Sequence, residues 1–493
     1  MANGLATAVA TLQAAGARYI IVPDQPYSFP LGGGAGNAAS RQAKLDYSLA
    51  QWSALTSAGV RFIPADFNAV RLAIAANPSA FGFEFIDTAS GHTACTQPAG
   101  VTTAWALLCS SNPASPSHFA TPTADQTRLF ADDQHLSTAG QKIQADYYYN
   151  LVVAPSQISF LAEAPIKTRT AMVDAISNQI LLSFGELGTF HGWITGDVSS
   201  LKMNNSYVGF PDDPGTPVAV TAGFDYRLSR EWLIGAAFSG GTTKQSFSLG
   251  GDYTQDEFAV SLYASYRNDP FWFDAIASWG TLHNDINRLI PIGITVQSNQ
   301  GRTNGTDISF AAETGYNFTT ALGGVAPVVG MPVKAVPPAA LYLTHGPVVG
   351  IVLQQVHIDG FTEFNPAGIT ALSFGSQRRD SAVTEFGYQA SLTFGMWQPY
   401  VKAVWNHELV DNDRTVTALL TSIAAPSYSL PAVDLGHDWG TGTLGLRVKL
   451  NASASAYAAF IAQVGQDSAA IYGGQVGLNV AFNWAPAPVV AKY

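Results

Sequence analysis

The feature that most constrains the fold is an alternation of apolar and polar side chains that begins near Phe190 and continues almost to the end of the chain. It is clearest in the four segments 218–228, 258–267, 444–450 and 475–484. A period of two places successive side chains on opposite faces of a β-strand. The downstream part of the chain is therefore predicted to consist of one strand after another.

The chemistry of the two faces indicates a transmembrane β-barrel. One face of each predicted strand is apolar, whereas the other carries Asp, Arg, Lys or Asn, and aromatic residues lie near strand ends. This is the pattern of a barrel with a lipid-facing outside and a polar lumen. Only 12% of the residues are charged, about half the fraction usual in soluble domains. No run of 18 apolar residues occurs, so transmembrane helices are not expected.

Loop lengths favour the barrel over a soluble sandwich or an adhesin stalk, which would show the same alternation. Tight turns are predicted at 228–232, 267–271, 394–398 and 450–455. Longer connections are predicted at 245–256, 285–304 and 410–437. About twelve strands can be counted, and an even number with short periplasmic turns is typical of outer-membrane barrels. The connection 319–342 is an exception, because it is long where a short turn is expected.

Upstream, the pattern changes to helices alternating with short strands. Helices are predicted at 5–16, 45–59 and 70–76, and short apolar strands at 19–22 and 60–65. This order predicts a parallel sheet with helices on its faces. Because only two clear strands are present, the segment is expected to be the later, partial half of an α/β domain.

Two helices are predicted to connect this segment to the barrel. The first runs from about Ser137 to Val153, and the second, opened by Pro165, runs from Ile166 to about Ser183. The second helix mixes apolar with charged residues, which suits a helix threading a water-lined lumen. The predicted divisions are 1–153 for the α/β segment, 154–187 for the linker and lumen helix, 188–484 for the barrel, and 485–493 for a C-terminal tail.

Asp132 and His135 are the candidate catalytic residues. A carboxylate three residues before a histidine, at a loop-to-helix junction, can bond the imidazole Nδ1–H and leave the other nitrogen as a base for a serine. Aspartates before helices are also common caps, so spacing alone leaves both interpretations open.

His92 and His118 lie in loops without paired carboxylates and are expected to be solvated. No zinc-ligand spacing occurs, and neither a metal nor a cofactor is expected.

The chain contains two cysteines, Cys95 and Cys109. Their close spacing suits one disulfide in an oxidising compartment, although two buried free thiols are the alternative.

The upstream motifs resemble the later blocks of the GDSL (SGNH) esterase/lipase family. These motifs are LQAAGARYIIVPDQP, FGF at 81–83, CSSNP at 109–113 and FADDQHLSTAGQ. The family ends its catalytic set with Asp-x-x-His, usually followed by Pro-Thr. Asp132 and His135 occupy those two positions, with Leu136 and Ser137 in place of Pro-Thr. The match continues into QADYYYNLVVAPSQISFLAEAP, as in esterases secreted as autotransporters.

The front of the family pattern is absent from this sequence. The nucleophilic serine of the family lies in a Gly-Asp-Ser-Leu block, and no Gly-Asp-Ser occurs here. The oxyanion Asn is likewise expected upstream of Met1, and the chain starts without a signal-peptide pattern. We therefore expect that the true N-terminus is missing, that the chain as it stands is inactive, and that a complete version is an ester hydrolase.

The downstream half resembles the autotransporter translocator domain. The resemblance rests on GRTNGTDISFAAETGYNF in the sixth strand, on DGFTE at 359–363, and on a final strand with Phe482 and Trp484, after which APAPVVAKY follows. It implies an outer-membrane location, a passenger facing the cell surface, and three partners: membrane lipid, the barrel-insertion machinery and an ester or lipid substrate. The net charge of -11 argues against nucleic acid. The alternative is a non-catalytic adhesion or transport barrel with a remnant passenger.

Overall fold

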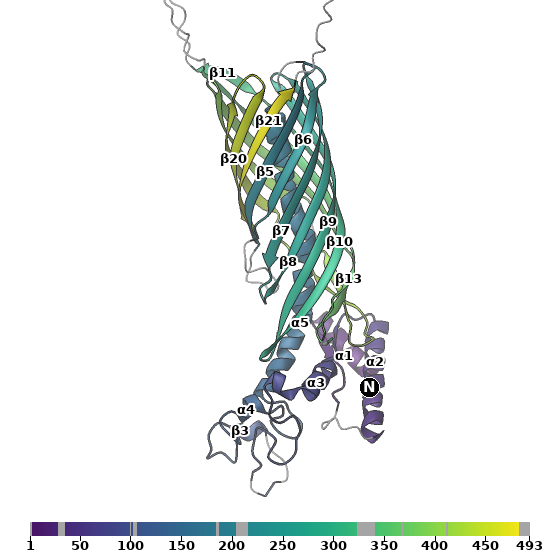
Figure 1. Ribbon diagram of the computed structural model, residues 1–493. Coiled ribbons are helices and arrows are strands. Elements are labelled where there is room, and N and C mark those ends of the chain that lie inside the picture. Colours follow the sequence, from purple (N-terminus) through teal and green to yellow (C-terminus); the bar gives the residue numbers. More distant parts are fainter. Residues whose placement is uncertain are drawn as a thin grey trace, which may run out of the picture.

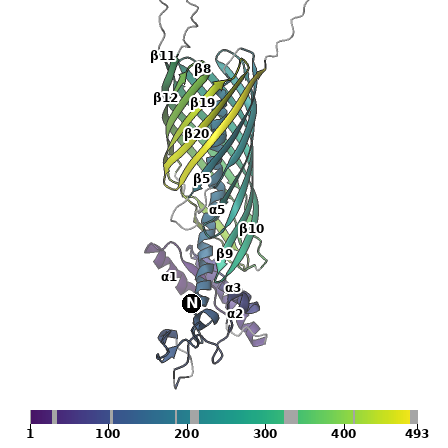
Figure 2. The same ribbon diagram turned by 60° about the vertical axis from the view of Figure 1, so that its left-hand side comes forward.

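The computed structural model describes residues 2–27, 35–98, 100–101, 106–183, 187–203, 215–322, 341–366, 368–410 and 413–482. A long β-barrel encloses one helix, and an α/β segment lies at one end of the barrel (Figures 1 and 2). The predicted tail 485–493 and most of the connection 319–342 lie outside the described residues.

Twelve long antiparallel strands form the barrel. They are β5 (Phe190–Met203), β6 (Val218–Arg227), β7 (Trp232–Ser246), β8 (Gly251–Asn268), β9 (Phe271–Ile292), β10 (Thr295–Tyr316), β12 (Leu341–Ile358), β15 (Gln377–Thr393), β16 (Trp397–Glu408), β19 (Asp438–Lys449), β20 (Ala454–Gln466) and β21 (Ala469–Phe482). Among the described residues the sheet has 13 strands, one of which is the short β11 (Phe318–Leu322). Pairing of β21 with β5 and of β10 with β12 closes the ring. The predicted antiparallel barrel of about twelve strands is confirmed.

Side chains alternate between the outside and the lumen as the sequence predicts. On β6, Val220 and Phe224 are exposed on the outside, whereas Asp225 is buried in the lumen. On β8, Leu262 is 65% exposed while its neighbour Ser261 is buried. An apolar outer face in contact with lipid and a polar inner face are what a membrane barrel requires.

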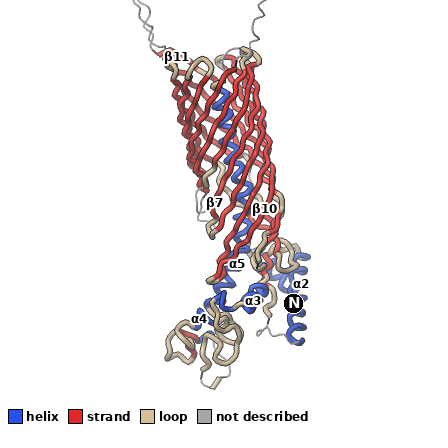
Figure 3. The backbone as a smooth tube through the Cα atoms, in the orientation of Figure 1, coloured by secondary structure: helices blue, strands red, loops and turns tan. Residues whose placement is uncertain are grey.

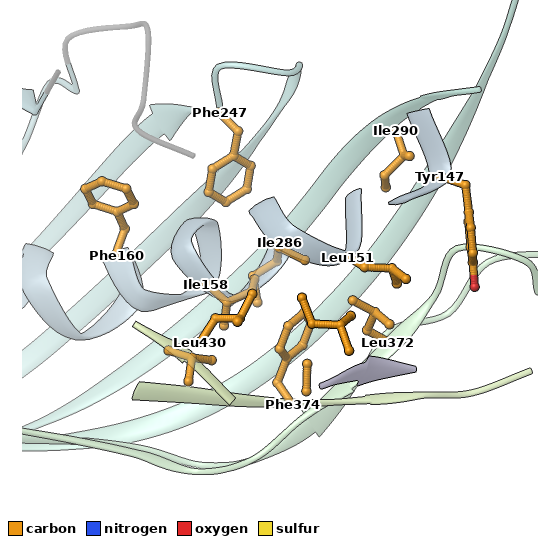
Figure 4. Close-up of a cluster of buried hydrophobic side chains, with 14 of the residues drawn as sticks. Tyr147, Leu151, Ile158, Phe160, Phe247, Ile286, Ile290, Leu372, Phe374 and Leu430 are labelled. Carbon is orange, nitrogen blue, oxygen red and sulfur yellow. The ribbon is translucent and has the colours of Figure 1, made fainter. Parts of the chain in front are cut away.

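Two of the predicted long loops are continuations of strands, so these two predictions are wrong. Strands β7 and β8 are joined by residues 247–250, and β9 and β10 by residues 293–294. The β9–β10 hairpin extends beyond the barrel wall because its inner face finds an apolar partner there. Ile286 and Ile290 of β9 are buried in the same core as Leu151 and Ile158 of the enclosed helix (Figure 4).

A small second sheet covers the same end of the barrel. It consists of β13 (Phe361–Thr362), β14 (Leu372–Phe374), β17 (Thr415–Leu420) and β18 (Tyr428–Pro431), and we call it the collar sheet. Strands β17 and β18 lie in the predicted connection 410–437. Leu372, Phe374 and Leu430 pack into the core around the helix (Figure 4).

The enclosed helix is α5 (Thr138–Ile180), a single helix of 43 residues where two were predicted. It begins at the N-cap Ser137, whose side chain accepts a hydrogen bond from the Gly140 amide, and it contains Pro155 and Pro165 in its interior. Figure 3 shows it running from the α/β segment through the length of the barrel. No helix in the described part of the chain is long and apolar enough to cross a membrane.

Charged side chains of α5 are paired with the barrel wall. Arg169, which is fully buried, forms ion pairs with Glu257 and Asp307. Nearer the α/β segment, Glu163 accepts hydrogen bonds from Arg379 at 3.0 Å and from Arg414 at 2.7 Å. A buried charge is tolerated only when it is paired and hydrogen-bonded. The mixed composition of this helix is therefore explained by its enclosure in a polar lumen.

The α/β segment contains the elements that the sequence predicts. They are α1 (Ala2–Ala14), β1 (Ile21–Pro23), α2 (Ala35–Ser57), β2 (Ile63–Ala65) and α3 (Phe67–Ala76). The segment also contains short elements that were not predicted, which are η1 (Pro78–Phe81), η2 (Ala106–Leu108), β3 (Cys109–Ser110), β4 (Ser117–His118) and α4 (Ala124–Thr127). Strands β1 and β2 pair in parallel. Ile63, Phe67 and Val70 join the core that also contains α5 and the collar sheet.

The assignment of the outer face can be tested on β8. We expect Leu262→Arg to destabilise the folded barrel by about 2–4 kcal/mol, because it places a charge in the lipid near the middle of the bilayer. The measurement is a denaturant titration of protein folded into lipid vesicles, followed by heat-modifiable gel mobility. The control is Asp256→Arg, an exposed position on the same face of β8 beyond the apolar band, which should change stability by less than about 1 kcal/mol. Equal losses would show that the face or the depth is misassigned.

Candidate active site

The Asp132 carboxylate and the His135 imidazole lie in direct contact at the entrance to α5. His135 Nδ1 is 2.8 Å from Asp132 Oδ2 and 3.0 Å from Oδ1. Asp133, the adjacent carboxylate, is exposed. Asp132 and His135 are thus in contact, as their spacing in the sequence predicted. Their geometry is that of a base and the acid that orients it.

Backbone amides fix the Asp132 carboxylate in place. Oδ1 accepts hydrogen bonds from the amides of Gln134 at 2.9 Å and His135 at 2.7 Å, and Oδ2 accepts one from Ala106 at 3.1 Å. Burial acts to raise the pKa of Asp132, but these hydrogen bonds and the one with the His135 ring outweigh it, so that its pKa is lowered. Asp132 is therefore ionised at neutral pH and accepts the Nδ1 proton of His135.

The imidazole of His135 faces an open cleft. Its side chain is 68% exposed, whereas that of Asp132 is 7% exposed. In the described part of the chain, the hydrogen bonds of the His135 ring are at the Nδ1 atom, which leaves Nε2 directed away from the aspartate. The cleft has a volume of about 510 Å³ and is lined by Pro26, Phe67, Arg71, Phe130, Gln134, His135, Leu136, Gln141, Gln144, Ala145 and Tyr148. The wall thus combines apolar side chains with polar ones, as a site for a small molecule does.

The segment that donates to Asp132 is tied down by a disulfide. Cys95 and Cys109 are bonded in the structure, with their Cα atoms 5.7 Å apart. Cys109 follows η2 directly, and η2 starts at Ala106, whose amide contacts Asp132. The disulfide thus lies close to the Ala106 amide, which is the third backbone donor to the Asp132 carboxylate.

A buried pair of carboxyl groups, which was not predicted from the sequence, lies beneath the wall of the cleft. Asp24 follows β1 and Asp66 follows β2, so parallel pairing of the two strands brings the two aspartates together. Asp24 accepts hydrogen bonds from the amides of Phe67 at 3.1 Å and Asn68 at 3.2 Å, while Asp66 caps α3. Acidic residues that directly follow both predicted strands were the signal that could have found the pair.

Burial, and then the charge of Asp66, raise the pKa of Asp24 to about 8. The pair therefore holds a proton at neutral pH. Asp24 lies two residues before Pro26, and Phe67 follows Asp66. Because Pro26 and Phe67 both line the cleft, the protonated pair fixes part of its wall.

The prediction that His92 is solvated without a carboxylate partner is wrong. Its Nδ1 atom lies 2.7 Å from Asp87 Oδ1, and its ring stacks on Phe85 with the centroids 4.1 Å apart. His118 is half-buried and contacts Thr96 and Ser115. Within the described residues, no group of three or more His, Cys, Asp or Glu side chains could hold a metal ion.

Comparison with known families identifies the barrel. Residues 192–460 match the family described as the autotransporter β-domain, which is more than half of the chain. The chain therefore belongs to the autotransporter family, and its barrel is a protein of the bacterial outer membrane. The connections 228–231, 269–270, 394–396 and 450–453 at one end of the barrel are short, whereas the α/β end also has the long connections 359–376 and 409–437. Long loops mark the extracellular end of such barrels, so the α/β segment faces the cell surface.

Relatives with known names extend the similarity into the α/β segment. The chain is 26% identical to esterase EstA of Pseudomonas aeruginosa over 425 residues, which are 84% of this chain and 61% of EstA. It is 27% identical to a protein encoded in the trpE–trpG intergenic region of Pseudomonas putida, covering 86% of this chain and 68% of that protein. Lipase 1 of Photorhabdus luminescens is 22% identical, covering 73% of this chain and 51% of the lipase. The chain thus spans about half to two thirds of the length of these relatives.

Among solved structures, the chain is similar to the translocator domain of the autotransporter NalP from Neisseria meningitidis. The TM-score is 0.48 and the identity 18%, covering 66% of this chain and 99% of that domain.

The raised pKa of Asp24 predicts a pH dependence of local stability. Its folded-state pKa of about 8 lies above the ordinary value of 3.8, so the stabilisation by the protonated carboxyl is lost as the pH rises through about 8. After correction for intrinsic exchange rates, amide hydrogen exchange in α3 should be faster at pH 9 than at pH 6. Asp24→Asn should remove this difference, whereas the control Asp125→Asn should retain it. The same pH dependence in both variants would contradict the assignment.

The disulfide gives a second prediction. In protein isolated from the outer membrane, alkylation without a reductant should label neither Cys95 nor Cys109, because the periplasm through which the chain passes is oxidising. Mass spectrometry should find both cysteines labelled only after reduction. Labelling of both thiols in unreduced surface material would show that they are free.

Proposed function

We propose that the chain is the transporter and the later part of the passenger of an outer-membrane autotransporter whose passenger hydrolyses carboxylic esters. The observation that carries this proposal is the contact between Asp132 and His135, with the His135 ring exposed in an open cleft. The similarity to EstA and to a lipase supports it.

In the proposed reaction, His135 is the general base and Asp132 is its orienting partner. A serine supplied by a Gly-Asp-Ser-Leu block attacks the ester carbonyl, and His135 Nε2 accepts the serine proton. The imidazolium then donates this proton to the departing alcohol, and water hydrolyses the acyl-serine by the reverse sequence of proton transfers. Asp132 holds the tautomer with the proton on Nδ1 and stabilises the imidazolium through the 2.8 Å contact.

The second candidate function is a barrel for display, adhesion or transport with a non-catalytic passenger remnant. The family match favours it, because the autotransporter β-domain covers residues 192–460 and none of the α/β segment. Sequencing of the DNA upstream of the codon for Met1 distinguishes the two. An in-frame Gly-Asp-Ser-Leu block supports the esterase, and a stop codon directly upstream supports the remnant.

Mutation of the motif tests the catalytic assignment in the chain extended by such a block. His135→Ala should lower the hydrolysis of a short-chain p-nitrophenyl ester by several orders of magnitude, and Asp132→Asn by somewhat less. Asp133→Asn is the matched control and should have little effect, because Asp133 is exposed. Greater damage from Asp133→Asn than from Asp132→Asn would show that the motif is misread by one residue. Full turnover by His135→Ala would overturn the esterase proposal.

A further inference from the structure

The two prolines inside α5 each remove one hydrogen bond of the helix at a known position. Proline has no amide hydrogen, so the carbonyl four residues before it loses its helical partner. Pro155 therefore frees the carbonyl of Leu151, and Pro165 frees the carbonyl of Leu161. Both leucines are fully buried, and a buried carbonyl without a partner is costly.

Each freed carbonyl accepts a hydrogen bond from the wall around the helix. The Tyr428 hydroxyl of the collar sheet donates to Leu151 O at 2.9 Å. The Gln255 amide of β8 donates to Leu161 O, also at 2.9 Å. Tyr428 and Gln255 are themselves buried, and they lie on separate elements of the chain. The two freed carbonyls thus meet two buried donors, one on the collar and one in the barrel wall.

We propose that these two proline-freed carbonyls and their donors form a latch that holds α5 at one axial position in the barrel. A slip of the helix by one turn moves it by about 5.4 Å, which exceeds the reach of a hydrogen bond. Such a slip takes both freed carbonyls away from their donors and leaves them without partners in a buried environment, although Gln255 keeps its hydrogen bond to Asn284. The latch thus favours one axial position of α5, whereas a helix without prolines would have no freed carbonyl to distinguish that position from its neighbours.

Two other hydrogen bonds from the wall to backbone carbonyls of α5 do not depend on a proline in this way. Gln475 donates to Ala171 O at 2.9 Å, and Gln377 donates to Ile158 O at 3.1 Å. The residues four positions after these acceptors, Ala175 and Ala162, are not prolines, so both carbonyls keep their helical partners. Loss of either wall bond therefore leaves no orphaned carbonyl. This difference provides the control for the test.

The latch fixes the place of the passenger as well as that of the helix. α5 starts three residues after His135 and continues without a break into the lumen. The helix is stiff, so its axial position determines how far the Asp132–His135 pair stands from the mouth of the barrel. This consequence does not depend on whether the passenger is catalytic.

Trypsin cleavage within α5 measures the latch in full-length protein folded in detergent. Lys167 and Arg169 are buried in the lumen, so cleavage after them, followed by mass spectrometry, reports the fraction of molecules whose helix has moved out. Tyr428→Phe should speed this cleavage about tenfold, because one buried carbonyl is left without a donor. Pro155→Ala restores the amide that Leu151 O lacks. In the Pro155→Ala background, Tyr428→Phe should change the rate by less than about twofold.

Gln255→Leu, made with and without Pro165→Ala, is an independent second test. Gln255→Leu should speed the cleavage when Pro165 is present and should have little effect in the Pro165→Ala background. The control is Gln475→Leu, whose effect should be the same whether Pro155 and Pro165 are present or replaced. Equal damage from Tyr428→Phe with and without Pro155, or no damage at all, would overturn the proposal for the collar donor. Equal damage from Gln255→Leu with and without Pro165, or no damage at all, would overturn the proposal for the donor in the barrel wall.

Discussion

The structure depends on the enclosure of α5, a helix that is too polar for lipid and too apolar near the collar sheet to lie free in water. Its charges are neutralised by the barrel wall, as in the contacts of Arg169 with Glu257 and Asp307. Its apolar face at the barrel mouth shares a core with the β9–β10 hairpin, the collar sheet and the α/β segment. Removal of the barrel would expose both kinds of surface, so the enclosed helix is stabilised by the wall and the collar around it.

This arrangement explains how a candidate site can be held steady at the surface of a cell. His135 lies three residues before the start of α5, and Asp132 is fixed by amides on either side of it, including that of Ala106 beside the Cys95–Cys109 disulfide. The cleft wall is supported by the Asp24–Asp66 pair, which links β1 to α3. Rigid elements position the site on three sides, which is the condition for defined catalytic geometry.

Local patterns in the sequence were sufficient for much of this description. Alternation along β6 and β8 identified the outer and inner faces, because the period of a strand fixes the direction of its side chains. The Asp-x-x-His spacing brought Asp132 to His135 because both residues lie in one turn. Strand ends were predicted less well: β9 and β10 extend beyond the barrel because Ile286 and Ile290 find partners on α5, which no pattern within the hairpin reveals.

By itself, the sequence determined the class of the barrel, the faces of its strands and the acid–histidine pair, since each depends on residues close together in the chain. Only the tertiary structure decided that α5 is one helix. Pro155 and Pro165 predict breaks when read locally, because each removes a backbone hydrogen bond. The replacement donors come from Tyr428, 277 residues beyond Leu151, and from Gln255, 94 residues beyond Leu161. A partner so distant in sequence is brought into contact only by the closed barrel.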